Sequence, residues 1–170
     1  MGVTAADEKY PIRKPTRLKE WDYSQNGAYF LTICTKNKEK TLCDIVGGGA
    51  LDAPQQVLSD CGKTAEKYII STNNIPRVTV DKYVIMPNHI HMIVFLEGPN
   101  GPSRAPAPTN ALIPHVVSTL KRFVNREIGA PVFQRSFHDH IIRSEKDYQR
   151  IWNYIDTNPA KWGDDCFFVP

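Results

Sequence analysis

The chain has 170 residues, of which 41% are apolar and 23% are charged, and its formal net charge is +3, as in ordinary soluble globular proteins. It contains no run of about 18 apolar residues and its N-terminus has no apolar signal-peptide core, so we expect a cytoplasmic protein rather than a secreted or membrane-spanning one. The four cysteines have no C-x-x-C spacing, which gives no support to a zinc-ribbon or thioredoxin-like site.

Residues 1–170 are expected to form a single domain. Positive charge is concentrated in an N-terminal arm, residues 1–24, where five cations lie between Lys9 and Lys19 and the next carboxylate is Glu20. Such a local patch can neutralise phosphates although the net charge is small, but a solvated arm explains it equally well.

The first half of the chain alternates between strand-like and helix-like patterns. β-Branched and aromatic residues favour strands, and apolar residues three or four positions apart favour a helix. In chain order the pattern predicts a strand over 28–35, a small hairpin or ordered loop around Gly47–Gly49, a helix over 55–71, and strands over 78–85 and 89–96 joined by a turn at Pro87 and Asn88.

The second half begins with a flexible connector over 98–110, rich in Gly and Pro. An amphipathic helix follows over 112–128 and should end at Gly129; then come a strand over 137–143 and a helix that Ser144 opens and Pro159 ends. The order β-α-β-β-α-β plus one helix predicts an α+β fold of the ferredoxin-like, split β-α-β type. Its antiparallel sheet should carry helices on one face, with the C-terminal helix in addition.

The residues MPNHIHMIVFL, 86–96, contain the chemically most suggestive pattern. Residues i and i+2 of a strand point to the same face, so His89 and His91 should stand side by side and could ligate a divalent metal. Tyr154 and Asn158 are four residues apart in the last predicted helix and therefore share a helical face. That helix can lie along the sheet near the histidines and bring all four side chains together.

Each of these residues also has a structural explanation. Paired histidines on a strand are often only hydrogen-bonded, and the chain contains a second H-x-H at His138 and His140. Tyr154 lies among apolar neighbours where a tyrosine usually packs. Asn158, directly before Pro159, could simply satisfy backbone groups at the helix end.

Four stretches in the expected order, RLKEWDYSQNGAYFLTICT, DKYVIMPNHIHMIV, FQRSFHDHIIRSEKDY and NYIDTNPAKW, resemble the single-tyrosine HUH transposases. The resemblance is to the branch of REP-associated tyrosine transposases, which are related to transposases of the two-hundred-type insertion sequences. It extends from about Arg17 to Trp162 and includes the His-apolar-His pattern at His89, Ile90 and His91.

The resemblance implies a transposase-type endonuclease and strand-transferase that acts on single-stranded DNA beside hairpins without ATP. His89 and His91, with Asn158, would hold Mg²⁺ or Mn²⁺. Tyr154 would attack a DNA phosphodiester, giving a 5′-phosphotyrosine and a free 3′-hydroxyl. Tyr148 is the competing tyrosine, but it does not share a helical face with Asn158.

Cations and aromatic residues are candidates for DNA contacts. The aromatic candidates for base stacking are Tyr10, Trp21 and Tyr23. The candidates for phosphate contacts are Arg13, Lys14, Arg17 and Lys19 in the arm, Lys121 and Arg122 in the helix, and Arg135 and Arg143 beside the fourth main strand. The expected partner is single-stranded or hairpin DNA and not a membrane, and both a monomer and a homodimer are compatible with the sequence.

Other functions fit parts of the same pattern. Rolling-circle replication initiators share the H-x-H and tyrosine logic, and a nucleic-acid-binding module on the same fold could keep the site without turnover. A metal that only stabilises the fold is a third alternative. Relaxases fit less well, because their tyrosine usually precedes the histidines.

Overall fold

A computed structural model of the chain describes residues 21–47, 54–98 and 111–169. Its main sheet has four antiparallel strands in the order β4-β5-β1-β6, formed by Val78–Met86, His89–Leu96, Gly27–Cys34 and His138–Ile142. This is the strand order of a split β-α-β fold, and it confirms the predicted fold class. The N-terminal cations from Arg13 to Lys19, and residues 99–110 of the connector, lie outside the described residues.

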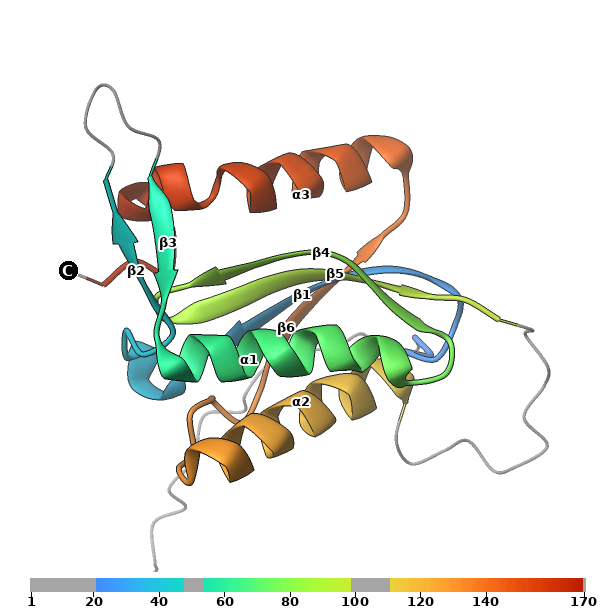
Figure 1. Ribbon diagram of the computed structural model, residues 1–170. Helices are drawn as coiled ribbons and strands as arrows, with labels where there is room; N and C mark the ends of the chain where they lie inside the picture. The colour runs from blue at the N-terminus through green and yellow to red at the C-terminus, as the bar shows by residue number, and fades with distance from the viewer. Residues whose placement is uncertain (1–20, 48–53, 99–110, 170) are drawn as a thin grey trace, which may run out of the picture.

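Helices cover both faces of this sheet (Figure 1). The first two, α1 (Asp60–Ser71) and α2 (Leu112–Ile128), lie together on one face and enclose the larger hydrophobic core. The third, α3 (Glu145–Thr157), lies alone across the other face, where Ile151 and Ile155 pack on Val84, Met86 and Ile93. The predicted additional C-terminal helix therefore has a face of the sheet to itself.

The central strand β5 contributes to both layers. Its residues Ile90, Met92, Val94 and Leu96 point into the core under α1 and α2, whereas Ile93 and Phe95 pack on the α3 side. His89 and His91 have the same parity as Ile93, so they lie on the α3 face at the beginning of the strand. Two-sided burial explains why this strand is apolar almost throughout and only its first residues are polar.

The predicted helix over 55–71 is too long at its start. Residues Gln55–Leu58 form strand β3 instead, paired antiparallel with β2 (Cys43–Val46). The Ser59 hydroxyl accepts a hydrogen bond from the backbone N–H of Gly62 at 3.0 Å and begins α1 at Asp60. The start of α1 is therefore determined by the pairing of β3 with β2 and by the N-cap at Ser59. Neither feature is part of the apolar spacing from which the helix was predicted.

Other local predictions agree with the structure. Gly129 ends α2 with a φ of 77°, a left-handed conformation that favours glycine, and Ser144 caps α3 by accepting from the N–H of Asp147. After α3 the chain turns through a 3₁₀ segment, Pro159–Asp164, and returns toward the sheet. None of the helices in the described part of the chain is long and apolar enough to cross a membrane.

Candidate metal and nucleophile site

The paired histidines, Tyr154 and Asn158 meet between the sheet and the end of α3, as the sequence predicted. In the sheet, His91 lies opposite Thr32 of β1, and His89 lies opposite Cys34 at the end of that strand. Both imidazoles are buried, with exposed fractions of 0% for His89 and 1% for His91. Asp165, which follows the 3₁₀ turn, completes the cluster.

The buried side chain of Asn88 determines which ring nitrogen of His89 carries the proton. Its amide nitrogen donates to two backbone oxygens, Phe167 O at 2.8 Å and Lys38 O at 3.4 Å, so its oxygen must face the other way. That oxygen lies 2.9 Å from His89 Nδ1, which must therefore carry the proton. The Nε2 atom of His89 is left with a bare lone pair, and this buried atom has no hydrogen-bond partner among the described residues.

His91 is held between two hydroxyl groups. Its Nδ1 atom lies 2.8 Å from Thr32 Oγ1, and its Nε2 atom lies 3.2 Å from Tyr154 Oη. The Tyr154 hydroxyl donates to Asp165 Oδ2 at 2.9 Å, which places the phenol oxygen as an acceptor toward His91. A threonine hydroxyl can donate or accept, so Thr32 can support either tautomer of His91.

Asp165 connects the sheet to α3 through its carboxylate. Its Oδ2 atom accepts from Tyr154 and, at 2.8 Å, from the amide nitrogen of Asn158. Its Oδ1 atom accepts from the backbone N–H of Phe167 at 2.7 Å. Because the Asn158 nitrogen faces Asp165, the oxygen of the same amide points away from it, and within the part of the chain that the structure describes this buried Oδ1 has no hydrogen-bond partner.

The donor atoms of the cluster suit a divalent metal. One ligand atom each from His89, His91 and Asp165 all lie within 4.8 Å of one another. Two buried acceptors without partners, His89 Nε2 and Asn158 Oδ1, belong to the same cluster, and buried polar atoms without partners normally need an explanation. Imidazole nitrogen with carboxylate and amide oxygen is a ligand set suited to Mn²⁺ and less typical of Mg²⁺.

Burial controls the protonation of the cluster. It lowers the pKa of His89 to about 4, against an opposing effect of the Asp165 charge, and that of His91 to about 3. Both imidazoles are thus neutral near pH 7, as metal ligation requires. Burial also raises the pKa of the Tyr154 phenol, and the hydrogen bond to Asp165 raises it further. For Asp165, burial acts to raise the pKa, but hydrogen bonds from Phe167 N–H and Asn158 outweigh it and hold the pKa low.

Aromatic residues on either side of Asp165 cover the histidines. The Phe167 ring lies with its centroid 4.7 Å from that of His89 and 5.9 Å from that of His91. The Trp162 ring lies 6.0 Å from His89. Since both imidazoles are almost fully buried under these rings, the Phe167 side chain must move before a large ligand can touch them.

The competing tyrosine and the second H-x-H are not part of the cluster. Tyr148 donates to Asp81 Oδ2 at 2.8 Å, and this bond raises its pKa to about 12. His140 pairs with Asp147 on the surface at 2.7 Å. His138, opposite Thr32 at the edge of the sheet, is exposed, and its ring lies 6.3 Å from the Phe167 ring.

The candidates for DNA contact have mixed placements. Arg122 and Arg135 line one cavity beside α2 together with Lys121, whereas the guanidinium of Arg143 lies 5.6 Å from the Trp21 ring, outside that cavity. Tyr23 is only 4% exposed and packs in the larger core. The prediction that a DNA base stacks on Tyr23 is therefore wrong. The arm candidates Tyr10, Arg13, Lys14, Arg17 and Lys19 lie outside the described residues.

Four residues of the cluster were not singled out by the sequence: Thr32, Asn88, Asp165 and Phe167. Thr32 and Asn88 could have been found, since one lies on the strand that pairs with β5 and the other directly precedes His89. Asp165 and Phe167 come from an irregular segment with no periodicity, so no pattern in the sequence places them over the sheet.

Comparison with known proteins gives three informative similarities, while no model of a protein family matches. An uncharacterized protein of Haemophilus influenzae is 34% identical over 178 residues, which cover 92% of this chain and 93% of the relative. A protein of the same bacterium named "Putative REP-associated tyrosine transposase" is 27% identical over 150 residues, 84% of this chain and 75% of that protein. A solved REP-associated tyrosine transposase bound to a REP hairpin shares the fold, with a TM-score of 0.59 and 22% identity over 81% of this chain and 69% of the other.

The fold and these similarities define the class of protein as transposase-like, as the sequence predicted. The chain belongs to one family with the uncharacterized protein of Haemophilus influenzae that it matches over nearly its whole length, and it is similar to the protein named a putative REP-associated tyrosine transposase.

Proposed function

We propose that the protein cleaves and rejoins single-stranded DNA beside hairpins, with Tyr154 as the nucleophile. The observation that carries this proposal is the position of the Tyr154 oxygen, 3.2 Å from His91 Nε2 and 2.9 Å from Asp165, directly at the candidate metal site. A tyrosine that served only to pack α3 on the sheet would not need to place its hydroxyl against a buried histidine and a carboxylate.

In the proposed reaction the phenol oxygen of Tyr154 forms a bond to phosphorus, and the bond from phosphorus to the 3′ oxygen breaks. The phenol proton leaves along the existing hydrogen bond toward Asp165, and the departing 3′ oxygen takes up a proton to become a hydroxyl group. The product is a 5′-phosphotyrosine, which conserves the phosphodiester energy so that rejoining needs no nucleotide cofactor.

The residues that would hold the metal are His89, His91 and Asp165, with Asn158 Oδ1 as a further oxygen ligand. A divalent cation bound there would withdraw charge from the scissile phosphate and lower the pKa of the phenol. The two imidazoles contribute by staying neutral near pH 7, and Asn88 and Thr32 contribute by fixing their orientation. Access for the phosphate requires the Phe167 ring to leave the histidines.

Hairpin DNA is the proposed substrate because a related transposase has been solved with a REP hairpin bound. The described part of the chain offers a basic groove beside α2 that could contact such DNA. The proposed ligand is a DNA stem with single-stranded flanks, because the tyrosine attacks an unpaired strand.

The test uses hairpin oligonucleotides with single-stranded flanks, labelled at either end and incubated with the full chain and Mn²⁺. On a denaturing gel the 3′-end label should stay with the protein and the 5′-end label should be released in a shorter strand. Tyr154→Phe should abolish the adduct, and the matched control Tyr148→Phe should keep it. Absence of an adduct from the wild type across varied hairpins would refute the enzyme and favour a binding module.

A further inference from the structure

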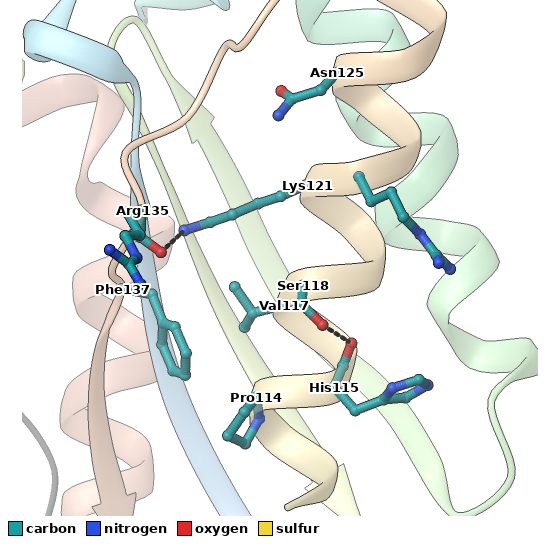
Figure 2. A pocket seen from close by; sticks show the side chains of 9 residues that line it. Pro114, His115, Val117, Ser118, Lys121, Asn125, Arg135 and Phe137 are labelled. Atoms are coloured by element: carbon teal, nitrogen blue, oxygen red, sulfur yellow. Dashed lines mark hydrogen bonds between the residues drawn. The ribbon is translucent and has the colours of Figure 1, made fainter. Parts of the chain in front are cut away.

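A groove lies beside α2, on the face of the sheet opposite the paired histidines. Figure 2 shows the side chains that line it. It encloses about 590 Å³ between α2 and the segment that precedes β6. Along α2 its wall extends from Pro114 to Asn125, and the opposite wall is formed by Arg135 and Phe137. The size is sufficient for a small charged group, such as a phosphate with part of its sugar, rather than for a water molecule alone.

Lys121 crosses the groove and fixes its two walls relative to each other (Figure 2). Its ammonium group donates to the backbone oxygens of Gln134 and Ser136, each at 2.7 Å, and more weakly to Arg135 O at 3.4 Å. Lys121 is only 8% exposed. Lys121 therefore has a structural role, because its hydrogen bonds join α2 to the segment before β6. The same hydrogen bonds hold its positive charge inside the groove.

The groove is positively charged. Lys121, Arg122 and Arg135 line it together with His115, and none of the described residues that line it is acidic. Within the described ranges neither Arg122 nor Arg135 forms an ion pair, whereas Lys67, Lys82 and Arg150 on other surfaces are each paired with a carboxylate. Two arginines without an ion pair among the described residues, gathered in a concave site, are suited to an anionic ligand.

The wall of this groove is connected to the candidate active site. Phe133 forms a β-bridge with Thr35, and the N–H of Gln134 donates to Cys34 O at 2.9 Å. Cys34 is the strand partner of His89. The same segment then enters β6, the edge strand of the sheet. Arg135 and Phe137 of this segment line the groove, and the next residue, His138, lies opposite Thr32 and contacts the Phe167 ring.

We propose that the groove binds the sugar-phosphate backbone of the same DNA strand that Tyr154 attacks, after the strand has passed around the edge at β6. This inference rests on the proposed function and specifies where the substrate continues beyond the reacting phosphate. Guanidinium groups bind phosphate oxygens through paired hydrogen bonds, which suits Arg135 and Arg122 to the direct contacts. The ammonium group of Lys121 adds positive charge to the groove, while its N–H groups donate hydrogen bonds to the protein backbone.

The test compares wild type with the double variant Arg122→Gln/Arg135→Gln, by fluorescence anisotropy on labelled hairpins with single-stranded flanks. The double variant should bind about 3- to 30-fold more weakly, and the slope of log K against log salt should decrease by about 0.7 for each lost phosphate contact. Lys63→Gln, which removes an exposed charge on α1, is the matched control and should change neither quantity. Mn²⁺ binding to the double variant should equal that of the wild type.

Neutral methylphosphonate linkages in the flank locate the contact. Placed at the phosphates that occupy the groove, they should weaken wild-type binding and have no further effect on the double variant. Equal affinity and salt slope for the double variant and wild type would overturn the inference, even where covalent adducts still form. Failure of the proposed function is distinguishable, because the wild type would then give no adduct although the difference in salt slope persisted.

Discussion

Acidification should destabilise the metal-free protein through its two buried histidines. In the folded state, burial lowers the pKa of His89 to about 4 and that of His91 to about 3, against an ordinary value of 6.5. The unfolded chain therefore binds protons that the folded chain cannot bind. The free energy of unfolding is highest above pH 6.5 and falls as the pH is lowered toward 4 and 3.

The expected loss is large relative to the stability of a domain. Each pKa unit corresponds to about 1.4 kcal/mol, so between pH 7 and pH 5 each histidine should remove about 2 kcal/mol. Together they should remove about 3 to 4 kcal/mol, against a total stability of about 5 to 15 kcal/mol for a typical domain.

The assay is urea unfolding at pH 7, 6 and 5 with a chelator present. Other groups also titrate in this range, so wild type is compared with His89→Gln/His91→Gln, whose stability should depend much less on pH. His115→Gln, which removes an exposed imidazole outside the cluster, should retain the wild-type dependence. Parallel pH profiles for the wild type and the double variant would refute the reasoning, because the buried neutral histidines would then not cause the effect.

Three further predictions concern individual contacts. Mn²⁺ at about 100 times its Kd should stabilise the wild type by about 2.7 kcal/mol and raise Tm by about 5 to 10 °C. Asp165→Asn should lose most of this shift; no shift in the wild type would contradict the metal site. In calorimetric titration, Thr32→Val should weaken Mn²⁺ binding about 10- to 100-fold by freeing the ring of His91, while Thr32→Ser should retain it. Equal affinities for Thr32→Val and the wild type would remove the orienting role of Thr32. Lys121→Met should lower the free energy of unfolding in urea by about 1 to 3 kcal/mol, since the backbone carbonyl groups of Gln134 and Ser136 lose their charged donor. An unchanged free energy of unfolding in Lys121→Met would show that Lys121 does not stabilise the fold.

The parts of the site that lie on regular elements could be predicted from the sequence. The period of two in β5 places His89 and His91 on one face, and the period of 3.6 in α3 places Tyr154 above Asn158. The helix crosses the sheet at the right place because Ile151 and Ile155 must cover Met86 and Ile93. Periodicity and burial act together here, so sequence and structure agree.

The remainder depends on contacts between segments far apart in the chain. Asp165 joins the site only because the 3₁₀ turn after α3 directs the chain back to the sheet, and hydrogen bonds to Tyr154 and Asn158 hold it there. The strand Gln55–Leu58 forms because β2 offers a partner, which outweighs the apolar spacing that predicted a helix. Such pairings depend on tertiary structure and leave no local pattern.

Identification of the residue that becomes attached to DNA tests the central claim most directly. The covalent adduct formed with hairpin DNA and Mn²⁺ should be digested with nuclease and protease, and the modified peptide sequenced by mass spectrometry. We predict a phosphorylated nucleotide remnant on the Tyr154 phenol oxygen, absent when His89 is replaced by Ala. A remnant on Tyr148, or on a residue outside the cluster of His89, His91 and Asp165, would contradict the account.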